Sequence, residues 1–202
     1  MKYWYNKNTK EGIMESRCKW CNLNNKLYID YHDKEWGIPV YDDKKLFELL
    51  LLESFQAGLS WETILNKREH FRASFDNFDY YKISNYDQSK IEKLLTNKGI
   101  IRCRRKITAT ISNAKIFISI IKEWGSFSNY IWHFTNNKII INKTNKIPTN
   151  NELSDTISKD LKKRGMKYVG TTIIYSYLQA IGVINDHELN CFKRIGEVNE
   201  KI

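Results

Sequence analysis

Apolar residues recur at helical spacing along most of the chain. Residues 42–52 begin with two aspartates that suit a helix N-terminus, and the leucines and phenylalanine that follow from Leu46 repeat on one helix face. Further helical patterns occupy residues 61–70, 89–97, 104–124, 126–134, 151–164 and 171–181. Residues 138–141 have the apolar, β-branched character of a strand. We therefore predict an all-α fold in which two helical lobes share one structure.

The length of the chain fits one domain. Its 202 residues, 42% of them hydrophobic, are enough to bury a core. Residues 1–16 are polar and aperiodic, so we expect a flexible N-terminal extension followed by a single domain over residues 17–202. The longest apolar runs, residues 47–52 and 116–121, are far shorter than the roughly 20 residues of a membrane span. Because no export signal is visible, we expect a cytoplasmic protein without a membrane partner.

The charge balance points to a polyanionic partner. Lys and Arg total 33 against 23 acidic residues, which gives a net charge of +10. Such an excess favours nucleic acid, because basic side chains that contact phosphates release counterions. A lysine-rich composition bias would raise the net charge in the same way without any binding role. Charge alone thus makes nucleic acid a candidate partner and leaves the composition bias open.

Two of the four cysteines and two of the four histidines lie near the ends of the chain at positions that suit one metal ion. His187 and Cys191 have an i,i+4 spacing, which places both side chains on one face of a helical turn. Cys18 and His32 complete a Cys2His2 set. A set with no open coordination position is typical of structural zinc. The sequence therefore predicts one structural Zn²⁺ that joins the N-terminal and C-terminal segments.

Other interpretations of the cysteines stay open. The spacing Cys18-x2-Cys21 is common in zinc modules and would leave His32 free. A cysteine can also be a small residue of the apolar core. Cys103 has no assignment. Disulfides are not expected in a chain without an export signal.

Aromatic residues gather around one acidic residue in the first third of the chain. Glu53 ends the apolar run of residues 49–52, so partial burial is expected, and a buried carboxylate needs a partner or a ligand. The neighbouring flat side chains are Trp20, Tyr28, Tyr31, Trp36 and Trp61. Together they suit a slot for a planar, electron-poor heterocycle, and a cationic one gains most. The alternative is that these rings belong to the core.

A glycine-framed turn separates the last two helical patterns. Gly165 and Gly170 lie in the basic segment 162–172. Such a turn lets backbone N–H groups approach a phosphate while the following helix offers its positive end. This geometry is typical of DNA docking that ignores base sequence. An ordinary turn between helices with a solvated basic run is the alternative.

Taken together, these motifs resemble one known family. They comprise RCKW at 17–20, YIDYHDKEWG at 28–37, LESFQAGLSW at 52–61, residues 162–172, and NDH at 185–187 with Cys191. In this order they resemble the 3-methyladenine DNA glycosylase I family of the helix–hairpin–helix superfamily. The resemblance covers residues 17–191, which is most of the chain. It implies a helix–hairpin–helix glycosylase fold and a monomer that binds double-stranded DNA containing alkylated bases.

The resemblance also implies roles for individual residues. The zinc ligands would be Cys18, His32, His187 and Cys191. The base pocket would be lined by Trp20, Tyr28, Tyr31, Glu53 and Trp61, with Glu53 and Tyr31 as catalytic residues. The DNA-binding residues would be Gly58 and Leu59, which fill the gap left by a flipped nucleotide, and Gly165, Lys167, Gly170 and Thr171 of the hairpin. The chain departs from the family in the extra thiol of Cys21, one added residue between Cys18 and His32, and the N-terminal extension.

The implied reaction is hydrolysis of the N-glycosidic bond of 3-methyladenine in DNA. Bifunctional relatives in the superfamily use a lysine two residues after the last glycine of the hairpin, where this chain has Thr172, so no strand cleavage is expected. Asp186 is the only candidate for a downstream catalytic aspartate, and it receives no catalytic role because it adjoins His187. The alternatives are a zinc-stabilised, non-catalytic DNA-binding protein and a glycosylase for another damaged base.

Overall fold

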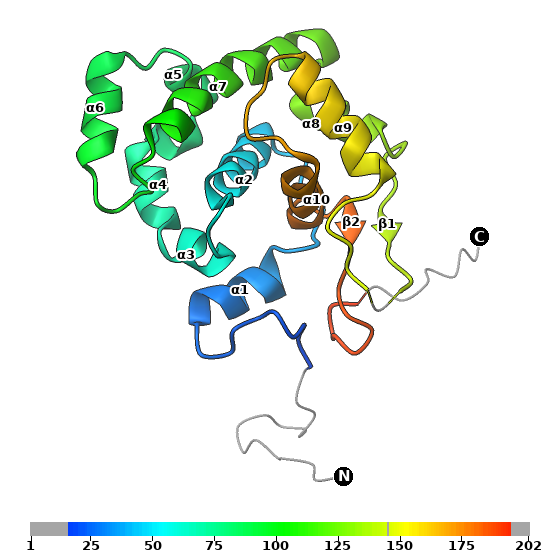
Figure 1. Ribbon diagram of the computed structural model, residues 1–202. Coiled ribbons are helices and arrows are strands. Elements are labelled where there is room, and N and C mark those ends of the chain that lie inside the picture. The colour runs from blue at the N-terminus through cyan, green and yellow to red at the C-terminus, as the bar shows by residue number, and fades with distance from the viewer. Residues whose placement is uncertain (1–15, 145, 195–202) are drawn as a thin grey trace.

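The computed structural model describes residues 16–144 and 146–194, and its regular structure is mostly helical, with two short strands (Figure 1). The elements are α1 (Lys26–Lys34), α2 (Asp43–Gln56), α3 (Trp61–Asn66), α4 (Arg68–Ser74), η1 (Asp76–Phe78), α5 (Tyr80–Ile83), α6 (Gln88–Thr96), α7 (Arg104–Trp124), α8 (Phe127–His133), β1 (Ile140–Ile141), α9 (Glu152–Lys163), α10 (Thr171–Ala180) and β2 (Ile184–Asn185). The all-α prediction is confirmed. Within the described residues, no helix combines the length and the apolar content that crossing a membrane requires.

The predicted helices begin where their sequences supply caps. The Asp42 side chain accepts a hydrogen bond from the Lys45 backbone N–H and so starts α2. Asn151 and Ser154 form a reciprocal capping box at the start of α9. The short strand β1 falls inside the predicted segment 138–141 and pairs in parallel with β2. These local signals explain why the element boundaries agree with the sequence pattern to within a few residues.

The prediction of one continuous helix over residues 61–70 is wrong. The chain forms α3 and α4 in its place, separated at Lys67. The Arg68 side chain is 5% exposed and donates to Glu48 at 2.6 Å and to both carboxylate oxygens of Glu35 at 2.8 Å. These ion pairs hold the first turn of α4 against α2 and the end of α1. Helix α1 and strand β2 were not predicted, since neither carries a continuous apolar stripe.

One apolar core is shared by the two lobes. Figure 1 shows α2 and α10 in the middle of the molecule, with α4 to α7 on one side and α8 and α9 on the other. Buried leucines and phenylalanines of α2 pack against α7, where Phe117 stacks on Phe127 with ring centroids 4.1 Å apart. A second, smaller apolar cluster contains Cys18, Tyr31 and Cys191. This smaller cluster joins the N-terminal segment to the C-terminal one.

The ends of the described chain are tied to each other. The Phe192 N–H donates to the carbonyl of Ser16, the last residue of the predicted extension, at 2.9 Å. The rest of that extension, residues 1–15, lies outside the described residues, as do residues 195–202 at the end of the predicted domain.

The packing of Phe117 generates a stability prediction. The ring is fully buried between Phe47 and Phe127, and its removal would leave a cavity. Phe117→Ala is expected to lower the free energy of unfolding by about 3–5 kcal/mol in a denaturant titration. Leu23→Ala is the control, because Leu23 is 60% exposed and its loss should change stability by less than about 0.5 kcal/mol. Equal effects of the two substitutions would contradict this account of the core.

Candidate active site and metal cluster

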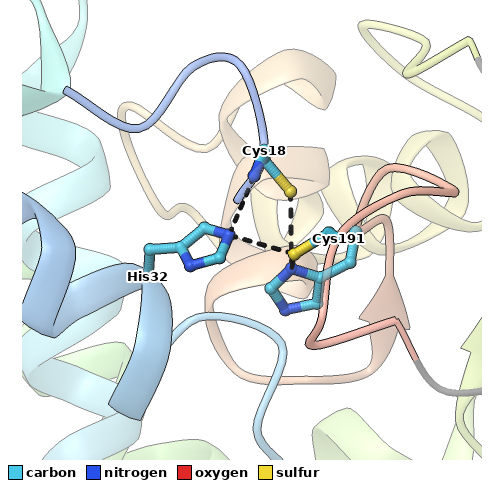
Figure 2. Close-up of side chains that lie close together, drawn as sticks. Cys18, His32 and Cys191 are labelled. Carbon is cyan, nitrogen blue, oxygen red and sulfur yellow. Dashed lines mark hydrogen bonds between the residues drawn. The ribbon is translucent and has the colours of Figure 1, made fainter. Parts of the chain in front are cut away.

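The four predicted metal ligands meet in one place. The ligand atoms of Cys18, His32, His187 and Cys191 all lie within 4.8 Å of one another, and all four side chains are buried. Figure 2 shows Cys18 and Cys191 from opposite ends of the chain beside the ring of His32. The Cys191 Sγ lies 3.4 Å from His32 Nε2 and 3.4 Å from His187 Nδ1, and the Cys18 Sγ lies 3.5 Å from His187 Nδ1. Tetrahedral zinc with bonds of about 2.0–2.3 Å would place its ligand atoms about 3.3–3.8 Å apart, so these spacings fit such an ion.

Surrounding groups orient the four ligands. The Nδ1 of His32 lies 2.7 Å from the Asp33 carboxylate, which leaves Nε2 facing the cluster. Asp33 is in turn held by the Arg17 guanidinium at 2.7 Å. The other ring is turned the opposite way, since Nε2 of His187 lies 3.3 Å from the Trp36 carbonyl and Nδ1 faces the thiols. Outer groups that hold one imidazole nitrogen and free the other are typical of metal sites.

Placing two thiols and two imidazoles together in a buried site costs free energy unless a metal cation binds between them. Burial raises the pKa of the Cys18 thiol to about 12 and lowers the pKa of His187 to about 4. Backbone N–H groups of Glu188 and Lys193 nevertheless point at the two sulfurs at 3.4 Å, as they would toward thiolates. The cluster is therefore arranged for anionic sulfur, which a bound metal cation would stabilise.

The remaining cysteines lie apart from this group. The Cys21 Sγ lies 3.7 Å from the Tyr28 carbonyl and is not among the four clustered ligand atoms. Its place in the structure favours the His32 ligand set over the competing Cys18-x2-Cys21 set. Cys103 is partly exposed and precedes α7.

A pocket of about 160 Å³ opens beside the metal cluster. Helices α1, α2, α3 and α10 and three non-helical segments contribute its walls. All five predicted base-pocket residues line it: Trp20, Tyr28, Tyr31, Glu53 and Trp61. The rings are held at defined angles, with the Tyr31 and Trp61 centroids 5.1 Å apart and those of Trp20 and Trp36 4.8 Å apart. The pocket therefore has flat apolar walls that suit a planar ligand.

Glu53 is the acidic residue that lines this pocket. The side chain is 4% exposed, and its Oε2 makes no hydrogen bond to any described residue. Burial raises the pKa of the carboxyl group to about 8. A buried polar atom without a partner is costly, and it marks a position where a ligand can supply the missing interaction. The indole N–H groups of Trp20 and Trp61 are also buried without a partner among the described residues.

Tyr31 lies at the junction of the pocket and the metal cluster. The residue is 2% exposed, and the next residue in the chain is His32 of the metal cluster. Burial, with the nearby Glu53 as a smaller cause, raises the pKa of the Tyr31 hydroxyl well above its usual value. The hydroxyl therefore stays protonated and is available as a hydrogen-bond donor.

The predicted DNA-binding residues occupy two loops. Gly58 has φ +83° between α2 and α3, with open space where a side chain would be, and the neighbouring Leu59 is 41% exposed. Gly165 has φ +97° at the end of α9, whereas Gly170 has φ −61° and precedes α10 without a side-chain cap. The second left-handed residue of the hairpin is therefore Tyr168, with φ +58°.

Lys167 and Thr171 are tied into the scaffold by different atoms. The Lys167 backbone exchanges hydrogen bonds with the Asn113 side chain, at 2.9 Å and 2.8 Å. The Thr171 hydroxyl lies 2.9 Å from Ser154 and also contacts Asp155. This leaves the Lys167 ammonium group for another partner and fixes the start of α10.

The two loops are joined to the pocket through α2 and α7. The Ser54 hydroxyl, next to Glu53 in the chain, lies 3.1 Å from the Tyr168 carbonyl. Lys106 donates to the carbonyls of Phe55 and Ala57 at 2.8 Å and lies 5.9 Å from the centroid of the Tyr168 ring. These contacts therefore connect the hairpin, the Gly58 loop and the pocket to one another.

Several lining residues were not predicted as site residues. They are Gln56, Ile147, Ser176 and Gln179, whereas Trp36 was among the aromatic rings of the predicted slot. Gln56 carried a signal, because it falls inside the glycine motif that identified its neighbours. Ser176 and Gln179 are polar residues of the otherwise apolar α10, which is a weaker signal. Ile147 comes from a loop whose course no local pattern indicates.

Removal of one ligand should test the metal cluster. Cys191→Ala is expected to lower the bound metal per chain and the free energy of unfolding together, the latter by several kcal/mol, because a structural metal contributes directly to folding. Elemental analysis and chemical denaturation measure the two quantities. Cys103→Ala is the matched control, since that thiol lies outside the cluster. A Cys191→Ala protein of full stability would rule out a structural metal.

The buried Glu53 carboxyl should make stability depend on pH. Because its pKa of about 8 in the folded state exceeds the ordinary 4.5, the folded state binds more protons between these values, and stability falls as pH rises through that window. Glu53→Gln removes the titration. The variant is expected to match the wild type near pH 4.5 and to exceed it by up to about 5 kcal/mol above pH 8. A difference that does not grow with pH would show that Glu53 has an unrecognised partner.

Comparisons with known proteins agree with this geometry. The model of the methyladenine glycosylase family matches residues 20–194. The chain is 46% identical over 178 residues to DNA-3-methyladenine glycosylase 1 of Escherichia coli (strain K12), which covers 87% of this chain and 95% of that protein. A crystal structure of 3-methyladenine DNA glycosylase I superimposes with a TM-score of 0.86 at 46% identity, covering 89% of this chain and all of the other.

A second solved structure concerns ligand recognition. It addresses 3-methyladenine recognition by 3-methyladenine DNA glycosylase I from Staphylococcus aureus. That protein is 34% identical to this chain and superimposes with a TM-score of 0.84, covering 90% of this chain and 99% of its own. With the family model spanning the pocket, the hairpin and three of the four clustered ligands, the chain belongs to the methyladenine glycosylase family.

Proposed function

We propose that this protein is a DNA glycosylase that hydrolyses the N-glycosidic bond of 3-methyladenine in DNA. The observation that carries the proposal is the Glu53 carboxyl group, which is buried without a hydrogen-bond partner in a pocket walled by aromatic rings. Family membership and the names of the relatives support it. A protein that only bound the DNA backbone would need neither the pocket nor the unpartnered acid.

The chemistry of the lesion explains why the pocket holds so few catalytic groups. Methylation at N3 gives adenine a positive charge, which weakens the glycosidic bond and makes the neutral base a good leaving group. The enzyme therefore needs no acid to protonate the base. Its tasks are to extrude the nucleotide, at an unstacking cost of a few kcal/mol, and to select the cation. Trp61 and the tyrosines would contact the flat faces of the base.

Glu53 can provide the selection through its own protonation. With a pKa of about 8, the carboxyl group is mostly neutral at pH 7, so ionising it there costs free energy. A cationic base offsets this cost by direct attraction in a water-poor site, whereas a neutral base does not. The carboxylate would also accept hydrogen bonds from the edge of the adenine. We assign Tyr31 a supporting role, since its protonated hydroxyl can donate to a bound nucleotide.

The two loops next to the pocket would hold the DNA. Leu59 projects from the left-handed turn at Gly58 and would fill the gap left by the extruded nucleotide. The hairpin would bind the phosphate backbone through Gly165, Lys167, Gly170 and Thr171, helped by the open space above Gly170 and the N-terminal end of α10. All of these groups come from one chain, so a monomer acting on double-stranded DNA satisfies the proposal.

The metal in the Cys18, His32, His187 and Cys191 cluster would be Zn²⁺ with a structural role. Two thiols and two imidazoles match its preferred ligands and leave no position for a reacting water. When bound, zinc would cross-link the N-terminal and C-terminal segments through its four ligands. This cross-link would hold Trp20 and Tyr31 in the pocket wall, since both are close in sequence to ligands.

Incubation of alkylated DNA with the purified protein tests the proposed function. We expect chromatography of the released bases to show 3-methyladenine, and gel analysis to show no strand scission, because Thr172 cannot act as an amine nucleophile. DNA binding without base release would instead indicate a non-catalytic DNA-binding protein. Release of other bases alone would indicate a glycosylase for a different lesion.

The role of Glu53 predicts a specific catalytic defect. Glu53→Gln is expected to lower the rate of 3-methyladenine release by about 10²–10³-fold, because it removes the charge that favours the cation, while DNA affinity stays nearly the same. Single-turnover kinetics and a DNA-binding titration measure the two effects. Glu69→Gln is the matched control, since Glu69 is exposed on α4 and pairs with Arg72. Unchanged turnover in Glu53→Gln would remove Glu53 from the mechanism.

A further inference from the structure

Helix α10 presents two polar side chains to the base pocket. Ser176 and Gln179 are three residues apart and line the same cavity as Glu53, which comes from α2. Gln179 is 7% exposed. Neither residue is needed by the selection of a cation described above, because neither carries a charge. Their positions raise the question of what an uncharged hydrogen-bonding group reads there.

The orientation of the Gln179 amide is fixed by an acid behind it. Its Nε2 lies 2.6 Å from the Asp186 Oδ2. The Tyr175 hydroxyl donates to the same oxygen at 2.6 Å. A carboxylate can only accept hydrogen bonds, so Gln179 must contribute its NH₂ group to Asp186. The amide group therefore cannot rotate freely. Its nitrogen is bound to Asp186, and its oxygen is not used in that hydrogen bond.

That oxygen is free to receive a ligand. The Oε1 of Gln179 accepts no hydrogen bond from any described residue, and it is not among the atoms sealed from solvent without a partner. Gln179 lines the pocket, so a ligand bound there can approach this oxygen. The pocket consequently contains two acceptors without donors, Gln179 Oε1 and the Glu53 carboxylate, on different helices.

We propose that Gln179 determines base identity by accepting a hydrogen bond from the exocyclic amino group of the extruded adenine. This inference rests on the proposed function and goes beyond it. An adenine-type edge carries an amino donor at the position where guanine and hypoxanthine carry a carbonyl acceptor. A fixed carbonyl on the protein attracts the former and repels the latter, because two acceptors facing each other leave both unsatisfied.

The charge of the base is thus read by Glu53 alone, whereas the identity of its edge is read by Gln179 as well. 3-Methyladenine and 3-methylguanine are both cationic in DNA, so the Glu53 carboxylate attracts both. Asp186 acts as a positioning residue: it prevents the Gln179 amide from turning its NH₂ group toward the base. If that rotation were free, the same side chain would accept either edge and discriminate against neither.

Gln179→Met tests the inference, because methionine has a similar length and no hydrogen-bonding carbonyl. We expect the single-turnover release of 3-methyladenine from alkylated DNA to fall about tenfold, while release of 3-methylguanine is unchanged or rises. The ratio of the two rates should therefore narrow at least tenfold. Gln88→Met, on the exposed surface of α6, is the matched control and should keep the wild-type ratio.

A structural role of Gln179 would give a different result. Loss of its bond to Asp186 could disturb the neighbouring metal cluster, but that would lower both rates together and leave their ratio unchanged. Tyr175→Phe removes the other hydrogen bond to Asp186 without altering the pocket, and we expect it to keep the ratio. An unchanged ratio in Gln179→Met overturns the inference, as does an equal narrowing in Tyr175→Phe.

Binding of free bases provides a second test that needs no catalysis. Quenching of tryptophan fluorescence can follow 3-methyladenine and 3-methylhypoxanthine, which differ in having an amino group or a carbonyl at position 6 and in the proton that hypoxanthine carries on N1. We expect the wild type to prefer 3-methyladenine by at least tenfold and Gln179→Met to lose this preference. Equal preferences in both proteins overturn the inference. If the wild type releases no 3-methyladenine from DNA, the proposed function fails instead.

Discussion

The rest of the structure depends on one constraint, which is that Glu53 is buried beside aromatic rings with no hydrogen bond to its Oε2 from any described residue. The Glu53 carboxyl sits in the last turns of α2, directly after the buried residues 46–52, and it is itself only 4% exposed, so it cannot turn to solvent. The fold stabilises a site that is unfavourable when empty and complementary to a cation when filled. Such a site needs a rigid frame, because a mobile carboxyl group would find water or a basic side chain. The core of α2 and α10 and the clustered ligands at the chain ends provide that frame.

The parts that could be predicted from sequence are those with a local physical signal. Capping residues defined the start of α2 and α9, and the residue types Cys and His at four positions indicated the ligand cluster before any fold was known. Glu53 stood out because an acid after four leucines has few ordinary explanations. The five pocket residues followed from the aromatic clustering and the family resemblance together.

The parts that escaped prediction depend on contacts between distant segments. The break at Lys67 follows from ion pairs of Arg68 with Glu35 and Glu48, which no periodicity in residues 61–70 could reveal. Gln179 looked like an ordinary polar position of a helix until Asp186 was placed beside it. The left-handed residue Tyr168 was missed because glycine is the usual occupant, and Gly170 drew attention in its place.

The bond from Ser54 to the hairpin carries a further consequence. Glu53 and Ser54 are consecutive, so one residue faces the base and the next holds the loop proposed to grip the backbone. The separation between the base pocket and the phosphate-binding hairpin is then fixed by two consecutive residues of α2, Glu53 and Ser54. A nucleotide whose sugar–phosphate span differs from that of ordinary DNA would be out of register with the pocket even if its base fitted. The enzyme would in this way recognise the spacing between base and backbone as well as the base itself.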